Sequence, residues 1–302
     1  MNNNPLIAHV VCSNAKQSDY IKQEKKRGDH DCIVSRSDLC MILSNPHKWL
    51  NGWESADTSA STWGTVVDFM LMNDGKSEPP FVVTPETYTN EKGIEKPWNR
   101  NATVCREFED RHEGMLLISH ATYEAAQTAV YRIRDDAYLK PLFNGAAFQM
   151  WIEGAYKTKC GAVVLLKSLI DIVPSKTGDC LNWLADLKTT TDASTGVWPR
   201  KLFDMEYHIQ AALYLDMYNA ATGEERNTFA HVIQERDAPY EIGRRILDET
   251  FIEIGRAKYV EALNILGECY KTGAWPGYDD IGIGSTIRGF TVSSPKAWMV
   301  GI

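Results

Sequence analysis

The chain has 302 residues, of which 44% are hydrophobic and 24% charged, with 21 Gly and 12 Pro. This composition is typical of a globular protein and excludes collagen-like and low-complexity chains. A chain of this length can bury a full core as one large α/β domain or as two smaller ones. The formal net charge of −8 argues against a nucleic-acid partner, because phosphate contacts need Lys and Arg. That objection is weak, since an acidic protein can still carry a local basic groove.

Two further classes are excluded by simple patterns. No run of about 18 apolar residues occurs, so no transmembrane helix and no membrane partner are expected. The N-terminus lacks the basic and long apolar regions of a secretory signal, and we therefore expect a cytoplasmic protein. The seven cysteines are odd in number and none has CxxC spacing, which argues against a disulfide framework and a zinc ribbon.

The N-terminal third predicts an arm followed by helices. Residues 1–33 are mixed and polar, and we interpret them as a variable N-terminal arm that precedes a single domain at 34–302. Ser35 as N-cap and Asp38 three residues later form a capping-box pattern. A helix should start there and stop near Pro46, and apolar spacing predicts a second helix at 63–72.

The remaining elements follow from periodicity. Residues 73–118 look irregular, with short strands, and 121–139 form an amphipathic pattern typical of a helix. Three consecutive antiparallel strands are predicted, at 148–156, 161–173 and 182–188. Helices at 201–221 and 241–272, the second closed by Gly273, enclose a strand at 228–234. This order predicts an α/β fold with a mixed central β-sheet flanked by helices.

The most informative residues are two aspartates and a lysine in the predicted strands. Asp171 and Asp186 each interrupt an apolar strand, and Lys188 follows Asp186 by two residues, so both point to one face. Pairing of adjacent antiparallel strands can bring all three together. Two neighbouring carboxylates repel each other, and a divalent cation resolves the conflict. Hard oxygen ligands suit Mg²⁺ or Mn²⁺. A lysine beside the metal can help to activate a water.

The same pattern has a plainer interpretation, a buried Asp–Lys ion pair with no metal. The neighbouring residues favour the interpretation as a metal-binding catalytic site. Glu153, on the preceding predicted strand, could supply a further oxygen ligand. Gln210 and Tyr214 lie four residues apart, hence on one helical face, where an amide and a phenol suit phosphate or base contacts.

These motifs resemble a known family. Asp171, ADLKTT at 185–190 and YHIQAALY at 207–214 resemble the PD-(D/E)XK nuclease signature followed by a Gln-x-x-x-Tyr motif. Within that restriction-endonuclease-like superfamily, the chain is most similar to RecE-type (exonuclease VIII-like) exonucleases and, more remotely, to phage lambda exonuclease. The likeness extends over roughly residues 34–280, through VSRSDLCMILSNPHKW at 34–49, WGTVVDFMLM at 63–72 and IQERDAPYEIG at 233–243.

The resemblance implies metal-dependent, ATP-independent 5′-to-3′ digestion of one strand of linear double-stranded DNA. It implies metal ligation by Asp171 and Asp186, a catalytic role for Lys188, and support from Gln210 and Tyr214. The family also implies a ring-shaped homo-oligomer, a trimer or tetramer, and a single-strand annealing protein as partner.

The chain departs from the family pattern at two places. Asp68 stands where the family has a His, and we expect it to act as a further Mg²⁺ ligand. Leu169-Ile170 replaces an Arg-Pro, so one basic contact is missing. A helix N-terminus binds anions, and we interpret Ser35, Arg36 and Ser37 as a pocket for the DNA 5′-phosphate. Ordinary N-capping is the alternative.

Two other functions remain open from the sequence. One is an endonuclease on the same fold, which would not need DNA ends. The other is a DNA-binding or assembly protein that has lost catalysis, against which the intact pattern of Asp171, Asp186 and Lys188 argues.

Overall fold

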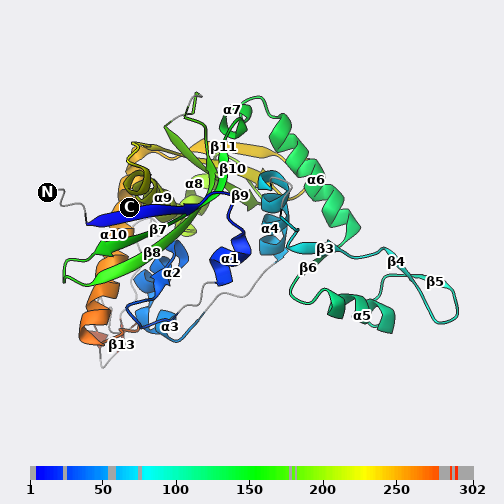
Figure 1. Ribbon diagram of the computed structural model, residues 1–302, viewed down its shortest axis with the longest axis horizontal. Coiled ribbons are helices and arrows are strands. Elements are labelled where there is room, and N and C mark those ends of the chain that lie inside the picture. The colour runs from blue at the N-terminus through cyan, green and yellow to red at the C-terminus, as the bar shows by residue number, and fades with distance from the viewer. Residues whose placement is uncertain are drawn as a thin grey trace.

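A mixed seven-stranded sheet forms the centre of the molecule (Figure 1). The computed structural model describes residues 5–22, 26–53, 59–73, 77–176, 179–180, 182–278, 286–287 and 290–291. The strand order is β1-β7-β8-β9-β10-β11, with β2 beside β8. β9 runs parallel to β10 and β2 parallel to β8, and the other neighbours are antiparallel. The strands of this sheet are β1 (Leu6–Cys12), β2 (Ile33–Val34), β7 (Ala147–Lys157), β8 (Val163–Val173), β9 (Trp183–Thr190), β10 (Thr228–Glu235) and β11 (Ile242–Ile246).

Helices cover both faces of this sheet, which confirms the predicted fold class. On one face α9 (Tyr207–Thr222) packs on β7 and β8, and α2 (Arg36–Ser44) and α10 (Glu249–Thr272) pack beside it. On the other face α4 (Ser59–Met72) lies on β9 and against α6 (His120–Asp135). The shorter helices are α1 (Gln17–Lys22), α3 (Pro46–Leu50), α7 (Lys140–Phe143) and α8 (Trp198–Asp204).

An extension leaves the body between α4 and α6 (Figure 1). Its base is the parallel pair β3 (Phe81–Val83) and β6 (Leu116–Ile118), and its outer part holds the hairpin β4 (Thr87–Thr89) and β5 (Glu95–Pro97). Helix α5 (Thr103–Arg111) follows the hairpin. The short strands were predicted from the sequence, whereas helix α5 was not. A further small hairpin joins β12 (Thr286–Ile287) to β13 (Phe290–Thr291).

The two edges of β8 are used differently. β7 pairs with one edge, in a register that runs from Ala147 opposite Val173 to Lys157 opposite Val163. The other edge is shared, because β2 pairs there at Leu165 and Leu166 and β9 pairs at Ile172. Among the described residues, positions 167–171 of β8 have no strand partner on that shared edge. The sheet therefore forks at β8, and Asp171 lies in the fork.

The N-terminal segment corrects one expectation. Residues 6–12, which we assigned to a variable arm, form the strand β1 that pairs with β7, and residues 33–34 form β2 inside the sheet. Alternation is weak in LIAHVVC because β1 lies at the sheet edge and most of its side chains are exposed. The helix start at Ser35 is confirmed, since its N–H and hydroxyl both donate to the Asp38 carboxylate, at 2.8 and 2.6 Å.

Two predicted helices are wrong in part. The segment 201–221 is broken at Glu206, which adopts a left-handed backbone conformation with φ of 55° and separates α8 from α9. The segment 241–272 begins as the strand β11, which pairs with β10. Helix α10 starts only after Asp248, whose side chain accepts the N–H of Thr250, and it ends at Gly273 as predicted.

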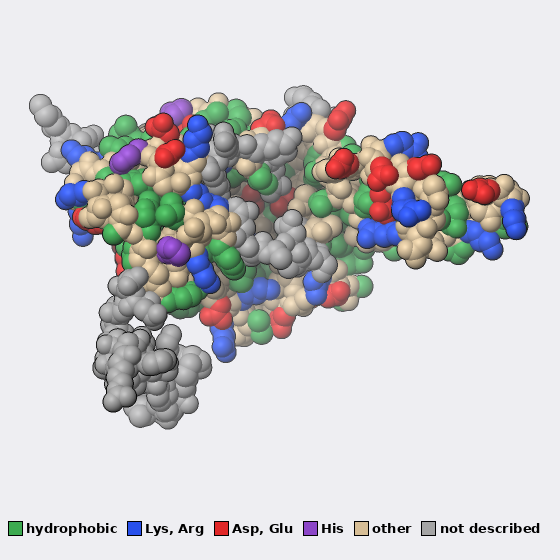
Figure 2. All heavy atoms as spheres, turned by 90° about the horizontal axis from the view of Figure 1, so that it is seen from below, with side chains coloured by type: hydrophobic (Ala, Val, Ile, Leu, Met, Phe, Trp, Pro, Cys, Tyr) green, Lys and Arg blue, Asp and Glu red, His purple; other side chains and the backbone are tan. Residues whose placement is uncertain are grey.

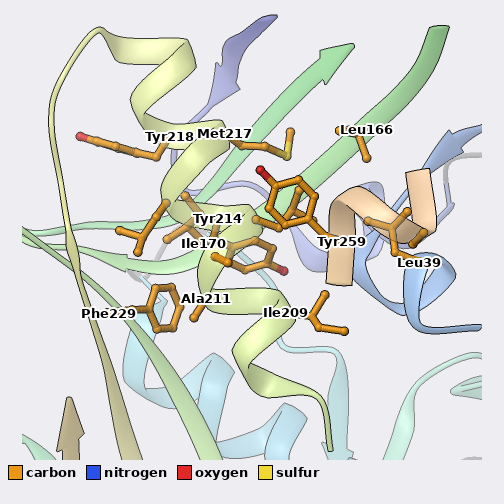
Figure 3. Close-up of a cluster of buried hydrophobic side chains, with 14 of the residues drawn as sticks. Leu39, Leu166, Ile170, Ile209, Ala211, Tyr214, Met217, Tyr218, Phe229 and Tyr259 are labelled. Carbon is orange, nitrogen blue, oxygen red and sulfur yellow. The ribbon is translucent and has the colours of Figure 1, made fainter. Parts of the chain in front are cut away.

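The core is deepest around α9, which is buried on nearly every side. Ile209, Ala211, Tyr214 and Met217 of this helix lie in one apolar cluster with Ile170 of β8 and Tyr259 of α10 (Figure 3). A helix that is apolar all round is typical of such an enclosed position. The central helix thus fixes Gln210 and Tyr214 against the forked sheet.

No helix in the described part of the chain is long and apolar enough to cross a membrane.

Candidate active site

The fork brings the two predicted aspartates together. Ile172 of β8 pairs with Ala185 of the antiparallel strand β9. Asp171 and Asp186 are therefore the next residues on these neighbouring strands, on the same side of that pair. Oδ2 of Asp171 accepts the main-chain N–H of Leu187 at 3.0 Å. Where β8 and β9 separate, the Asp171 carboxylate thereby takes the place of a main-chain carbonyl as the hydrogen-bond acceptor for β9. This contact fixes one carboxylate directly beside Asp186 and Lys188.

Asp186 is held from two sides. Its Oδ1 accepts a hydrogen bond from Nε2 of Gln210 at 2.6 Å, and its Oδ2 forms an ion pair with Nζ of Lys188. Asp186 is 1% exposed, so this ion pair is shielded from water and much stronger than a surface pair. Burial lowers the pKa of Lys188, but the charges of Asp186 and Asp171 outweigh it and raise that pKa overall. Lys188 is therefore a cation at neutral pH.

Asp68, on α4, is close enough to interact electrostatically with Asp186, Asp171 and Lys188. Burial, and then the charge of Asp186, raise the pKa of Asp68 to about 7. Burial, and then the charges of Asp186 and Asp68, raise the pKa of Asp171 well above its usual value. Three carboxylates thus repel one another around a single lysine. Without a metal, bound protons relieve this repulsion, as the raised pKa values of Asp68 and Asp171 show. A divalent cation can take the place of those protons and allow all three carboxylates to ionise.

This donor set fits a hard divalent cation, since Mg²⁺ and Mn²⁺ prefer carboxylate oxygens. In the described part of the chain, no three His, Cys, Asp or Glu side chains are already gathered in a geometry that could hold a metal ion. Both oxygens of Asp186 are engaged, one by Lys188 and the other by Gln210. Metal binding would require Lys188 to release Asp186 and the carboxylates to turn toward one another.

Glu153 is not part of this group, which corrects the prediction that it is a metal ligand. It lies opposite Lys167 in the β7–β8 register. That position is four residues from Asp171 along β8, or roughly 13 Å at the rise of a strand. The sequence placed Glu153 only on the strand that precedes Asp171, whereas the register of β7 against β8 shows how far along that strand it lies.

Helix α9 supplies Tyr214, the phenol that was predicted to support the site. Burial, followed by the charges of Asp186 and Asp171, raises the pKa of Tyr214 to about 12. Tyr214 is therefore neutral at physiological pH and can donate a hydrogen bond toward the carboxylates. Its position between the sheet and α10 is visible in Figure 3.

The predicted phosphate pocket is only partly open. Ser35 is engaged by Asp38, a buried carboxylate whose negative charge stands at the start of α2. Ser37 is exposed in the first turn of α2. Arg36, in contrast, donates to the Met205 carbonyl and lies with Cζ 5.5 Å from the ring centre of Tyr207. The structure thus assigns Ser35 a capping contact and leaves Arg36 as the cation of this segment nearest to the site.

Three residues around the site were missed in the sequence. Nζ of Lys188 lies 4.6 Å from the ring centre of Tyr207, so this ring contacts both Lys188 and Arg36. Gln149 of β7 donates from Nε2 to Oδ1 of Asp171 at 3.3 Å. The sequence signal for Gln149 was the presence of one polar residue within the otherwise apolar run FQMWI. Tyr207 stands three residues before Gln210, which is helical spacing toward the same face.

His231 is the third missed residue, and it lies beside Asp186 in the β9–β10 register. The rings of Trp198, Tyr207 and Phe229 enclose it, with ring centres 5.6–5.8 Å away. Burial lowers the pKa of His231 to about 3, so the imidazole is neutral. It adds no positive charge to offset the carboxylates.

The fold and this arrangement of two aspartates and a lysine on forked strands define a PD-(D/E)XK-type domain. A family model described as a PDDEXK-like domain of unknown function (DUF3799) matches residues 47–282. The chain belongs to this family, whose superfamily consists of nucleases that generally use divalent metals. The sequence matches none of the curated proteins.

A solved structure shares the fold over nearly the whole chain. A candidate exonuclease from Eubacterium rectale is similar, with a TM-score of 0.55 and 15% sequence identity. The match covers 96% of this chain and 98% of that one. At this identity the likeness bears on the fold alone.

The raised pKa of Asp68 predicts how stability depends on pH when no metal is bound. The folded state keeps the Asp68 proton up to about pH 7, whereas an unfolded Asp loses it near pH 4. Stability is therefore lost as pH rises through this window. Asp68→Asn, which cannot ionise, should have a Tm several degrees above wild type at pH 8 in EDTA. At pH 4 the two proteins should melt alike.

Thermal unfolding followed by circular dichroism provides the measurement, with Asp110→Asn as a control on the exposed surface of α5. The control should follow the wild type at both pH values. An Asp68→Asn variant that is less stable than wild type at pH 8 would contradict the proposed repulsion.

Proposed function

We propose that this protein is a metal-dependent, ATP-independent exodeoxyribonuclease that digests one strand of linear double-stranded DNA from 5′ to 3′. The observation that carries the proposal is the meeting of Asp68, Asp171, Asp186 and Lys188 at the fork of the sheet. Family membership supports nuclease chemistry. The polarity, the requirement for an end and a role in recombination by single-strand annealing rest on the resemblance of the motifs.

The residues of the site have distinct tasks in this reaction. Asp68, Asp171 and Asp186 would hold Mg²⁺, for which Mn²⁺ can substitute. The bound cation would supply charge neutralisation for the phosphodiester and lower the pKa of a water. Lys188, once released from Asp186, offers an ammonium group to the developing negative charge on the phosphate and orients the attacking water. Gln210 keeps Asp186 in place, and Tyr214 donates a hydrogen bond without adding charge.

The wider setting of the proposal also follows the resemblance. DNA ends are the substrate, a ring of three or four copies would keep the enzyme on DNA, and a single-strand annealing protein would take up the 3′-tailed product. The protein would act in the cytoplasm of a bacterial host cell. An endonuclease on the same fold remains the alternative, and covalently closed DNA separates the two.

Removal of the central charges should abolish digestion. Asp186→Ala and Lys188→Ala should each slow digestion of end-labelled linear duplex in Mg²⁺ by about 10³-fold or more, because transition-state stabilisation is lost. Asp110→Ala and Lys96→Ala remove exposed charges of the extension and serve as matched controls. Both should digest DNA at the wild-type rate, and EDTA should stop every active protein.

Two outcomes would overturn this assignment. Wild-type-like digestion by folded Asp186→Ala or Lys188→Ala, with folding checked by circular dichroism, would exclude the site. Cleavage of covalently closed plasmid as fast as of linear duplex would replace the exonuclease by the endonuclease.

The position of Arg36 predicts a preference for phosphorylated ends. A charge-assisted contact contributes about 1.5–3 kcal/mol, so Arg36→Ala should slow digestion of 5′-phosphorylated duplex about 10- to 100-fold. Duplex with a 5′-hydroxyl never makes this contact and should be affected much less. The comparison is made at constant salt, since general phosphate attraction depends on ionic strength.

Arg106→Ala is the matched control for Arg36, because Arg106 is an exposed arginine of α5 outside the site. It should leave both substrates unchanged. Equal losses on both substrates in Arg36→Ala would show that Arg36 contributes to general DNA attraction or to folding, and not to recognition of the end.

A further inference from the structure

A cavity of about 420 Å³ lies between the segment 14–21, helix α4 and the base of the extension. Its walls include Ala15 and Ile21 on one side and Phe69 and Leu116 on the other. Figure 2 shows a hollow near the centre of the corresponding face of the molecule, with acidic side chains visible inside it. The volume is within the range of sites that bind small organic groups, and it is far too small for a duplex.

The cavity borders the candidate active site directly. Asp68 forms part of its wall, and so does Gln149, the residue that donates to Asp171. A group bound in the cavity would therefore lie next to the reacting phosphate. Arg36 approaches the carboxylates from another flank, through α2 and the Tyr207 ring of α9, and neither helix lines the cavity.

The backbone of this wall is strained where it meets the site. Among the described residues, four that are not glycine have a positive φ, and two of them, Asn14 at 55° and Gln149 at 45°, line the cavity. Main-chain hydrogen bonds hold them together, from the N–H of Asn14 to Phe148 and from the N–H of Ala15 to Gln149. Such strain persists where surrounding structure enforces it and gathers at functional sites.

The chemistry of the walls suits a nucleobase. Apolar side chains of Ile21, Phe69 and Leu116 offer surfaces for the faces of a flat ring, and Gln149 adds a polar group to the lining. Unpaired bases are bound in this way, by contacts to the ring faces together with polar contacts at the ring edge. Stacking accepts every base, which is required of an enzyme that digests any sequence.

We propose that this cavity binds the unpaired base of the nucleotide that follows the scissile phosphate, the second from the 5′ end. The inference rests on the proposed function, and it adds a binding site that the metal centre does not include. With the terminal phosphate near Arg36 and the scissile phosphate at the carboxylates, the next nucleotide enters from the flank of α4. Binding of its base would hold the strand apart from its complement and define the step of one nucleotide.

The test uses 5′-phosphorylated linear duplexes that carry one abasic nucleotide at position 1, 2, 3 or 4 of the digested strand. The rate of the first cleavage is measured in single-turnover conditions. In wild type, an abasic site at position 2 should slow cleavage about 10- to 100-fold, the range expected for loss of one stacked base. An abasic site at position 4 should have little effect.

Two variants alter the cavity without replacing a carboxylate. Ala15→Trp fills it, and Ile21→Ser removes an apolar wall. Each should slow the intact duplex by a similar factor and abolish the difference between intact and position-2 abasic substrates. Ile7→Ser is the matched control, because Ile7 of β1 is 68% exposed and Ile21 is 65% exposed, and Ile7 does not line the cavity. It should retain the wild-type pattern.

A second measurement does not depend on catalysis. Saturation-transfer NMR in EDTA should detect contact of deoxyadenosine with wild type and Ile7→Ser, and should lose it in Ala15→Trp. If DNA is not digested but deoxyadenosine binding behaves as expected, the nuclease assignment fails and base binding in the cavity stands. If DNA is digested and both cavity variants keep the wild-type sensitivity at position 2, or wild type shows none, the proposal is overturned.

Discussion

The fork at β8 is the constraint on which the site depends. β7 occupies one edge of β8 along its length, so β2 and β9 have to share the other edge. Where they part, no described strand pairs with the edge of β9 that faces β8, and the Asp171 carboxylate accepts the N–H of Leu187. The same division places α2 directly after β2, so that the helix starts from the shared edge of β8. A sheet with complete pairing would have had no place for these charges, because buried main-chain groups must find partners.

The charge balance at this fork explains the composition of its surroundings. Lys188 offsets only part of the negative charge of the three aspartates, and a tyrosine ring rather than a carboxylate contacts its other side. The other polar groups around the site, the Gln210 amide, the Tyr214 phenol and the His231 imidazole, are neutral at physiological pH. They hold the site in shape without adding positive charge, so full ionisation of the three aspartates depends on a cation that replaces their protons. An acidic protein of net charge −8 is thus compatible with a DNA-cleaving site, since attraction of DNA requires only local positive charge.

The sequence was most informative where chemistry and periodicity coincide. Asp186 and Lys188 share a face because a strand alternates, and Asp171 had to lie on the preceding strand. Alternation says nothing about position along a neighbouring strand, and for that reason Glu153 was misplaced by four residues relative to Asp171. The left-handed backbone conformations of Glu206 and Gln149 could not be predicted from the sequence, because long-range packing imposes them. Edge strands were missed for a similar reason: β1 and β11 gain order from pairing and not from their own pattern.

The central claim is that the carboxylates at the fork bind a divalent metal, and a crystal structure with Mn²⁺ tests it most directly. We expect an anomalous peak with oxygens of Asp171 and Asp186 within about 2.0–2.6 Å, and with Asp68 bound to the ion directly or through a water. Lys188 should then have left Oδ2 of Asp186. A peak elsewhere in the molecule, or a fork that keeps the Asp186–Lys188 ion pair with no ion at saturating Mn²⁺, would contradict the account.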